Sequence, residues 1–390
     1  MEHNQNITYL IFLIFTGTAI LSTMALFTRQ SLLVAYIVLG AVLGPWGLKL
    51  VSNTEVIKQA GDIGIIFLLF LLGLHLHPQN LFHSLRKMSL ITFVSSVLFF
   101  FIGFITSYMF SFTLVQCGII GIATMFSSTI IGIKLLPTTI LHHQHTGELV
   151  VSILLLQDIL AIAALLAFEA INDQTRSFTH LGLILGAFPM LIILSYTFQR
   201  YVLSHLLARF DKIHEYIFIL SIGWCLCMAE FSHYLGLSAE IGAFIAGVAL
   251  AANPISFYIA ESLKPLRDFF LVIFFFTVGA SFNFDYFSAV IFPACVLATF
   301  VLLLKPVVFK WLLYRSGEVK KISWEIGVRL GQMSEFSLLV TYLALETKLL
   351  PPNSAYMVEA AIIITFIVSC YWTVMRYPTP LASTDQLRRD

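Results

Sequence analysis

Long runs of apolar residues separated by short polar stretches form the main pattern of this 390-residue chain. The runs suit helices of about 20 residues that cross a bilayer, not the alternating ten-residue strands of a transmembrane barrel. A helix also satisfies its backbone hydrogen bonds internally, as lipid requires. The pattern predicts an all-α integral membrane protein with thirteen transmembrane helices, at residues 7–27, 31–48, 60–76, 88–110, 113–134, 146–170, 180–203, 214–232, 237–252, 266–281, 286–313, 322–345 and 354–375.

The composition agrees with lipid as the main solvent. Hydrophobic residues make up 59% of the chain and charged residues 11%, and the mean hydropathy is +0.92. The net charge is +1, and the basic residues are scattered among short loops, so we expect no surface that binds nucleic acid. Because Glu2 and His3 precede the first apolar run in place of basic residues, we interpret that run as a retained helix and not as a cleaved signal.

Basic residues are distributed unevenly between the two sets of loops. Sixteen Lys and Arg residues follow odd-numbered spans and four follow even-numbered spans, while Lys305 and Arg329 lie within spans. Cytosolic loops carry the excess of Lys and Arg in multi-pass membrane proteins. The split therefore predicts that the N-terminus lies outside and the C-terminus lies in the cytosol.

The two halves of the chain resemble each other at an offset of about 207 residues. YIVLGAVLG at residues 36–44 aligns with AFIAGVALA at residues 243–251, and Ser127 aligns with Ser334. Small residues also recur because helices pack closely through them, but the constant offset favours a repeat. We predict two six-helix repeats and a linker helix, at about residues 7–170, 214–375 and 180–203. An odd shift in span number makes the second repeat inverted, as in secondary transporters.

Asp158 lies at the midpoint of the sixth predicted span, next to Gln157 and otherwise among apolar residues. A carboxylate at this depth costs roughly 2.5–3.5 kcal/mol on insertion scales, so we expect it to face the protein interior. The alternative to a functional role is that the buried carboxylate of Asp158 only forms a hydrogen bond to a neighbouring helix. Lys305, next to Pro306 in the eleventh span, is the predicted partner, unless its side chain extends to the membrane interface. Asp158, Gln157 and Lys305 are the predicted ion- and proton-binding residues.

Two further spans contain polar clusters at equivalent positions of the repeat, ATMFSSTII at residues 123–131 and RLGQMSEFSL at residues 329–338. Polar side chains and carbonyls in a broken helix can replace the water shell of a cation. For the hydroxyls the alternative is a hydrogen bond to the preceding helical turn. Arg329 is expected to form a helix ion pair with Glu325. The candidate site-lining residues are Ser127, Ser128, Thr129, Gln332, Ser334 and Glu335.

Three histidines, His142, His143 and His145, cluster in a predicted cytosolic loop. Histidine titrates near physiological pH and binds metals, so a pH-sensing or metal-binding role is an alternative to the simpler explanation of a solvated loop. A nucleophile paired with a base, or a metal cluster at usable spacing, is not found in the sequence. We therefore expect no enzyme, no catalytic residue, no cofactor and no metal site.

Five motifs resemble those of a known family: GPWGLKL at 44–50, LQD at 156–158, GAFIAG at 242–247, FFTVGASF at 275–282 and GQMSEF at 331–336. In this order and spacing they resemble the membrane domain of bacterial glutathione-gated potassium efflux (Kef-type) antiporters, in the monovalent cation:proton antiporter superfamily. The resemblance covers roughly residues 7–376. It implies a protein of the bacterial inner (cytoplasmic) membrane with thirteen helices, two of them interrupted and crossing beside the ion-binding aspartate.

The same resemblance implies roles for residues and domains. Asp158 matches the ion-binding aspartate, Lys305 matches the family lysine, and spans 4 to 6 and 11 to 13 form a mobile core beside a scaffold that makes a homodimer. Residues 1–376 correspond to the antiporter membrane domain and residues 377–390 to a short cytosolic tail, without the nucleotide-binding regulatory domain of typical Kef-type proteins. A separate regulatory subunit is then a candidate partner. Residues 258–268, expected to be a loop, resemble the segment that contacts the regulatory domain.

Together these features predict a secondary active antiporter that exchanges a monovalent cation for a proton by alternating access. Asp158 binds either ligand but not both, and Lys305 stabilises the carboxylate when no cation is bound. The resemblance favours potassium over sodium, whereas the residues alone leave selectivity open because it depends on cavity size and ligand number. With Gln157 in place of a second aspartate, exchange is expected to be electroneutral. A transporter or channel for another solute and a non-transporting membrane sensor are the alternatives.

Overall fold

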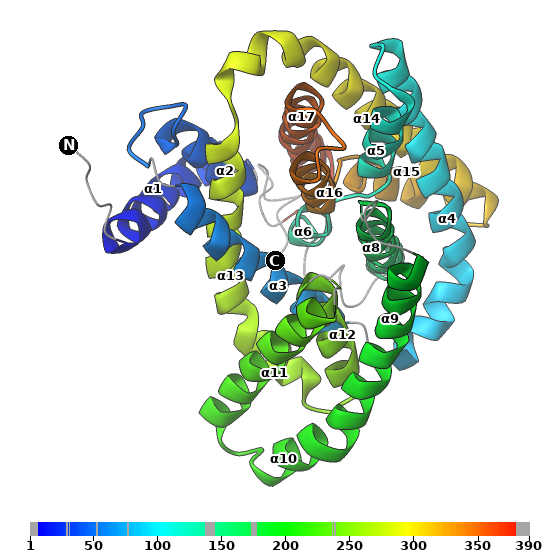
Figure 1. Cartoon of the computed structure of the whole chain (residues 1–390). Helices are drawn as coiled ribbons and strands as arrows, with labels where there is room; N and C mark the ends of the chain where they lie inside the picture. Colours follow the sequence, from blue (N-terminus) through cyan, green and yellow to red (C-terminus); the bar gives the residue numbers. More distant parts are fainter. Residues whose placement is uncertain are drawn as a thin grey trace. The chain divides into compact units, whose positions relative to one another are not determined.

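The computed structural model of the chain describes residues 7–28, 30, 32–51, 54–75, 78–136, 145–172, 178–235, 237 and 239–379. Helices joined by short connections make up most of these residues (Figure 1). In chain order they are α1 (Ile7–Phe27), α2 (Leu32–Leu43), α3 (Thr54–His75), α4 (Pro78–Met109), α5 (Leu114–Thr124), α6 (Thr129–Lys134), α8 (His145–Asn172), α9 (Phe178–Phe198), η1 (Gln199–Leu203), α10 (Ser204–Arg209), α11 (His214–Tyr234), α12 (Ala239–Ala251), α13 (Ser256–Ser281), η2 (Phe284–Tyr286), α14 (Phe287–Arg315), α15 (Lys320–Arg329), α16 (Glu335–Glu346) and α17 (Pro352–Arg376).

The helices occupy the ranges that the hydropathy pattern predicts. Each predicted span overlaps a helix, and the fifth and twelfth spans each overlap two half-helices separated by a break. The all-helical class is therefore confirmed, while the number of membrane crossings and the inversion of the repeats stay predictions. By length and composition alone, five helices of the described residues are long and apolar enough to cross a membrane, at Thr8–Phe27, Met88–Met109, His214–Tyr234, Phe284–Arg315 and Pro352–Arg376.

One predicted connection is wrong. Residues 258–268 do not form a loop but belong to α13, which begins at Ser256 and contains Pro265. A hydropathy window detects apolar character and not helicity, so the charged first half of this helix escapes it. Glu261 and Lys264, three residues apart, form an ion pair at 3.6 Å on the helix surface.

Two compact units divide the chain, and each takes segments from both halves of the sequence. The first unit contains residues 1–17, 39–82 and 166–281. The second unit contains residues 18–38, 83–165 and 282–390. The helices of predicted spans 4 to 6 and 11 to 13 fall in the second unit, except for the outer ends of α4 and α8, and so do all candidate site residues.

Glycine allows the closest helix contacts of the first unit. A Cβ atom on Gly247 of α12 would lie 2.1 Å from the carbonyl oxygen of Phe70 in α3. Its aligned partner in the first half, Gly40 of α2, approaches α13 in the same way, since a Cβ atom there would lie 2.0 Å from the carbonyl oxygen of Phe276. A side chain at either position would therefore force the helices apart. Both glycines thus make a close contact with a neighbouring helix, while the repeat itself stays a prediction.

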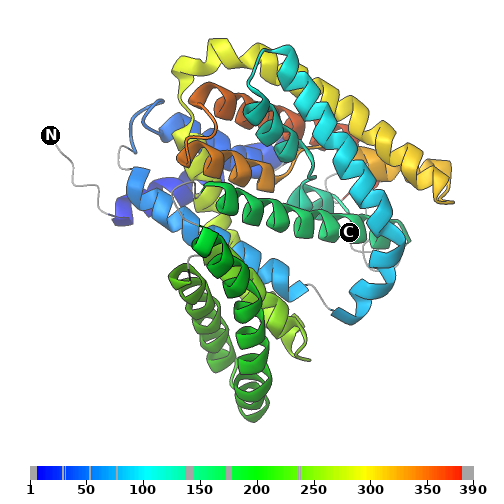
Figure 2. The ribbon, with the colours of Figure 1, turned by 45° about the vertical axis from the view of Figure 1, so that its right-hand side comes forward.

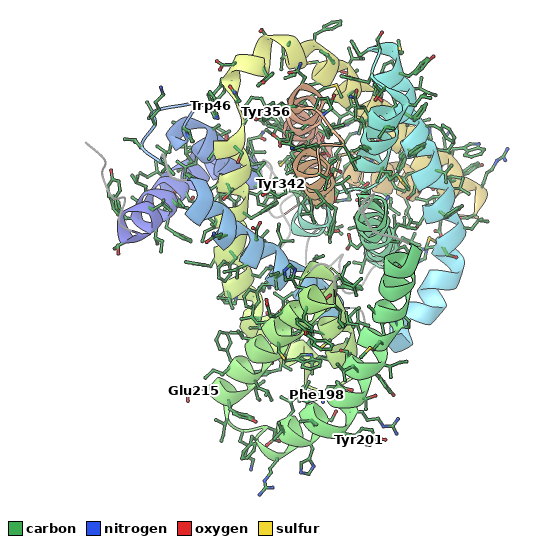
Figure 3. All side chains as sticks on the ribbon, viewed as in Figure 1. Trp46, Phe198, Tyr201, Glu215, Tyr342 and Tyr356 are labelled. Carbon is green, nitrogen blue, oxygen red and sulfur yellow. The ribbon has the colours of Figure 1, made fainter. Side chains whose placement is uncertain are left out.

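Apolar side chains of α3, α9, α11, α12 and α13 form the core of the first unit. At one end of this core the ring of Phe198, labelled in Figure 3, stacks on Trp224 of α11 with 5.1 Å between ring centroids. The indole N–H of Trp224 donates to the carbonyl oxygen of Ala246 at 3.1 Å, which ties α11 to α12. The buried indole thus keeps a hydrogen-bond partner, as a Trp in an apolar interior requires.

Helix α14 of the second unit has two apolar faces, one packed in a core and one exposed. Phe309 and Leu313 belong to a core that also includes α4, α8 and α15, and the ring of Phe309 packs on Phe99 of α4 with 5.1 Å between centroids. Figures 1 and 2 show α4 and α14 side by side. The opposite face exposes Leu303 and Val307. A long helix that is apolar on its exposed face as well is suited to contact with lipid.

Candidate ion-binding site

Two interrupted helices meet at their breaks in the second unit. Residues 125–128 separate α5 from α6, and residues 330–334 separate α15 from α16. The hydroxyl of Ser127 donates to the carbonyl oxygen of Leu330 at 2.8 Å, which joins the two breaks directly. Both polar clusters of the sequence therefore mark real interruptions of a helix, and the interruptions lie in contact.

Serine caps explain why the chain resumes a helix after each break. The hydroxyl of Ser128 accepts a hydrogen bond from the Ile131 N–H at 3.1 Å, in the first turn of α6. The hydroxyl of Ser334 accepts one from the Phe336 N–H at 3.1 Å, in the first turn of α16. Such caps satisfy backbone donors that have no partner within the helix. These two serines thus serve the backbone.

Asp158 of α8 is 1% exposed and faces the first break. Thr129, the first residue of α6, shares its hydroxyl between the two carboxylate oxygens, at 3.0 Å from Oδ1 and 3.2 Å from Oδ2. Glu335, the buried first residue of α16, lies within electrostatic range of the same carboxylate. Burying anionic oxygen is costly unless a proton, a cation or donors compensate it. The arrangement therefore favours the binding of a positive charge at Asp158.

Gln157 joins α8 to the backbone of the first break. Its Oε1 atom accepts from the Ser127 N–H at 3.1 Å, and its Nε2 atom donates to the carbonyl oxygen of Met125 at 3.4 Å. Both partners are backbone groups released by the interruption of the helix. The amide has a donor and an acceptor and so satisfies both, which a carboxylate could not do. Gln157 is therefore positioned to fix the break beside Asp158.

Lys305 of α14 is completely buried and connects the two breaks. Its Nζ atom donates to the carbonyl oxygen of Phe126 at 2.6 Å and to that of Gln332 at 3.2 Å. The Nζ atom also lies 4.8 Å from the ring centroid of Phe99. The side chain does not extend to the membrane interface, and no ion pair of the described residues joins it to Asp158. Freed carbonyls, one from each interrupted helix, take the place of the carboxylate partner expected from the sequence.

Gln332 is the second amide at this junction. Its Nε2 atom lies 3.5 Å from the carbonyl oxygen of Ser128, and its Oε1 atom accepts from the hydroxyl of Ser369 at 2.8 Å. Of the six candidate site-lining residues, Thr129 is the one whose side chain has a hydrogen bond to Asp158 among the described residues. The three serines contact backbone groups: Ser127 donates to a carbonyl of the second break, and Ser128 and Ser334 accept from N–H groups of the turns that follow them. None of these bonds is the expected one to the preceding helical turn, and a role of the serines in ion binding stays a prediction.

Arg329 forms the ion pair expected from its spacing. Its Nη2 atom lies 2.9 Å from Oε1 of Glu325, four residues earlier in α15. The guanidinium also donates to the carbonyl oxygens of Leu135 and Pro378, each at 2.9 Å. The planar group with its five donors suits several acceptors in fixed directions. Arg329 thus has a structural role at the ends of α6 and α17.

Three buried polar residues of α17 were missed by sequence reasoning. Thr365 accepts from the Met333 N–H of the second break at 3.2 Å, and Ser369 donates to Gln332. Glu359 is 7% exposed, and its Oε2 atom has no hydrogen-bond partner among the described residues. The signal that singled out Asp158, an acidic residue within an apolar span, also applies to Glu359.

The histidine cluster is only partly covered by the structure. His142 and His143 lie outside the described residues. His145 begins α8, and its Nε2 atom lies 2.9 Å from Oε2 of Glu318 in the connection between α14 and α15. Among the residues that the structure describes, no group of three or more His, Cys, Asp or Glu side chains could hold a metal ion.

A buried carboxylate beside two broken helices, within a highly apolar helical chain, is typical of secondary active transporters. The chain belongs to the sodium/hydrogen exchanger transmembrane family, which matches residues 11–375. It is therefore a multi-pass membrane protein of the cation:proton antiporter superfamily.

Curated relatives carry related descriptions. Over 370 residues the chain is 28% identical to the glutathione-regulated potassium-efflux system protein KefC of Escherichia fergusonii, covering 90% of this chain and 58% of that protein. It is 24% identical to K(+) efflux antiporter 6 of Arabidopsis thaliana, covering 80% of this chain and 53% of the relative. It is also 24% identical to the iron transporter MagA of Paramagnetospirillum magneticum, covering 88% of this chain and 80% of that protein. The chain thus spans little more than half the length of the first two relatives.

A solved structure has the same fold. The sodium proton antiporter MjNhaP1 from Methanocaldococcus jannaschii superposes with a TM-score of 0.70, covering 95% of this chain and 97% of that chain, at 17% sequence identity. The relatives and this structure are described as transporters, in agreement with the expectation of a non-enzymatic protein.

Proposed function

We propose that this chain exchanges a monovalent cation for a proton at Asp158 by alternating access. The observation that carries the proposal is the buried carboxylate of Asp158, which Thr129 contacts at 3.0 Å beside two joined helix breaks. Binding of a cation or of a proton lowers the buried negative charge, and the two ligands compete because they need the same oxygens. Potassium is the favoured cation, in line with the descriptions of KefC and of the plant relative.

Exchange is proposed to be electroneutral. Gln157 cannot titrate, and its amide is engaged by the Ser127 N–H and by the carbonyl oxygen of Met125. One monovalent cation then displaces one proton at Asp158, and turnover moves no net charge. Glu335 is the group that would change this ratio, because its carboxylate lies within electrostatic range of Asp158.

Lys305 is proposed to act on the site through the backbone. By donating to one carbonyl from each break, it holds the end of α5 next to the end of α15. The position of the first break in turn determines where Thr129 meets Asp158. Alternating access then follows from motion of the unit that carries the breaks.

The proposed orientation has the N-terminus outside and the C-terminus in the cytosol. The proposed partners are a second copy of the chain, in a homodimer, and a separate regulatory subunit.

Proteoliposomes containing the purified protein test the function. A pH-sensitive dye inside the vesicles reports proton movement when potassium, sodium or no monovalent metal cation is added. Gradients of a permeant anion, thiocyanate as its choline salt, set the membrane potential while the cation gradient is held fixed. We expect proton movement that requires the cation and a rate that is nearly independent of voltage. Proton movement without a cation would support a channel or leak instead, and a rate that rises clearly with potential would contradict one-for-one exchange.

A further inference from the structure

The end of α14 has the composition of a membrane interface. This helix belongs to the apolar segment Phe284–Arg315 and ends in exposed Trp311 and Tyr314, followed by Arg315. The Cζ atom of Arg315 lies 4.6 Å from the ring centroid of Trp311. Tryptophan, tyrosine and arginine gather where the hydrocarbon core meets the headgroups. The composition therefore favours a position at headgroup level for the residues that follow α14.

The chain turns back sharply after α14. Gly317 has a φ of +98°, a conformation that glycine adopts without strain. This turn leads within three residues to the start of α15, so Lys320 and Lys321 come near the last turns of α14. There they line an open surface cavity of about 540 Å³ with Lys310, Val319 and Trp324. The Nζ atom of Lys310 lies 5.1 Å from the ring centroid of Trp324, which forms one wall.

The nearby acidic groups have basic partners of their own. Glu318, which precedes the cavity in sequence, lies 2.9 Å from His145. Glu325, which follows it, lies 2.9 Å from Arg329. Among the residues that the structure describes, three lysines and no acidic residue line the cavity. Three cationic groups around one cavity at headgroup level match a phosphate anion, and each adds about 1 kcal/mol of attraction near a membrane surface.

We propose that this cavity binds the phosphate group of an anionic phospholipid. The lysines hold the phosphate oxygens, while Val319 and Trp324 contact the glycerol and the upper part of the acyl chains. Free phosphate has the same anionic oxygens but gains nothing from the apolar wall or from the position beside the hydrocarbon core. The lipid is thus favoured over the soluble ion, and a bound lipid would brace the connection between α14 and α15, the helices that carry Lys305 and the second break.

Binding of phosphatidylglycerol to the purified full chain tests the proposal. The protein is titrated in detergent with short-chain phosphatidylglycerol or phosphatidylcholine, and bound lipid is counted by native mass spectrometry. The test variant combines Lys310→Gln, Lys320→Gln and Lys321→Gln. The matched control combines Lys49→Gln, Lys264→Gln and Lys348→Gln, which removes the same charge from exposed positions elsewhere. Circular dichroism and size-exclusion profiles establish that both variants remain folded.

We expect the protein to retain phosphatidylglycerol in preference to phosphatidylcholine, and the test variant to bind it on the order of tenfold more weakly or less, with little change in the control. A single variant, Trp324→Ala, should weaken binding with no change in charge. Equal loss in the test and control variants would overturn the proposal in favour of general charge attraction. Full displacement of the lipid by an equal concentration of inorganic phosphate would also overturn it, since the site would then recognise the free ion.

Discussion

The Nζ atom of Lys305 lies 2.6 Å from the carbonyl oxygen of Phe126, within the break that follows α5. A lysine has three donors and no acceptor, so it suits carbonyls that an interrupted helix has released. The second contact, to Gln332 at 3.2 Å, belongs to the other interrupted helix. The lysine that the resemblance singles out thus donates to the backbone of both breaks, and its proposed action on the site runs through them.

Replacement of Lys305 should therefore affect stability as well as transport. Lys305→Met keeps the length of the side chain but leaves two buried carbonyls without their donor, so we expect the free energy of unfolding to fall by about 1–3 kcal/mol. Thermal unfolding of the purified protein, followed by intrinsic fluorescence, measures the effect. Lys264→Met, at an exposed position of α13, is the control and should change little. Loss of exchange by Lys305→Met at an unchanged unfolding temperature would contradict the backbone role and indicate a direct charge partner of Asp158.

Thr129 offers a second test, because its hydroxyl is the donor to Asp158. Thr129→Val preserves the shape and removes the hydroxyl, so we expect the apparent cation affinity at fixed pH to fall by about tenfold, whereas Thr129→Ser should remain close to the wild type. The measurement is the cation concentration that gives half-maximal exchange. Thr299→Val, which removes a hydroxyl bonded within α14, should leave that concentration unchanged. Equal effects of Val and Ser at position 129 would argue against the hydroxyl.

Gly327 provides a test of how α15 is positioned. A Cβ atom there would lie 2.6 Å from the carbonyl oxygen of Pro306, the residue that follows Lys305, so α15 can approach α14 only with glycine at this point. We expect Gly327→Ala to lower the free energy of unfolding by about 1–3 kcal/mol through overpacking. Gly118→Ala in α5 is a matched control, since a Cβ atom there would meet nothing within 4 Å. A Gly327→Ala protein as stable as Gly118→Ala would mean that the helices separate without cost.

The positions of the helices and breaks could be read from the sequence because each depends on a local pattern. Apolar runs gave the spans, and the polar clusters around Ser127 and Ser334 gave the interruptions. The pair of Arg329 and Glu325 follows from a spacing of four residues on one helix face. These features need no knowledge of which helices become neighbours.

The partners of the site residues could not be read in the same way. Lys305 bonds carbonyls that lie 179 and 27 residues away along the chain, and a backbone carbonyl leaves no signature in a sequence. A carboxylate such as Asp158 was the more visible candidate. Glu359 was within reach of the reasoning applied to Asp158, but its surroundings depend on how α17 packs. Residues 258–268 were missed for a different reason. Their charged side chains lower the local hydropathy, so the hydropathy pattern did not detect the first half of α13.

Orientation in the membrane rests on the distribution of Lys and Arg and can be measured separately. In a background in which the five cysteines are replaced by serine, Lys348→Cys should react with a membrane-impermeant maleimide in intact cells. Lys264→Cys should react only after the cells are permeabilised. Both positions are exposed, so access and not burial decides the result. Labelling of position 264 in intact cells, with no labelling of position 348, would show that the orientation is the reverse of the predicted one.

The central claim is that the cation and the proton share the carboxylate of Asp158, and Asp158→Asn tests it most directly because the amide keeps the shape and removes the charge. Exchange by this variant is measured in proteoliposomes with potassium and with sodium, beside Asp285→Asn, which makes the same change at an exposed position. We predict that Asp158→Asn loses exchange with either cation while its helix content and membrane insertion remain normal, and that Asp285→Asn retains the wild-type rate. Exchange at the wild-type rate by a folded Asp158→Asn protein would contradict the account.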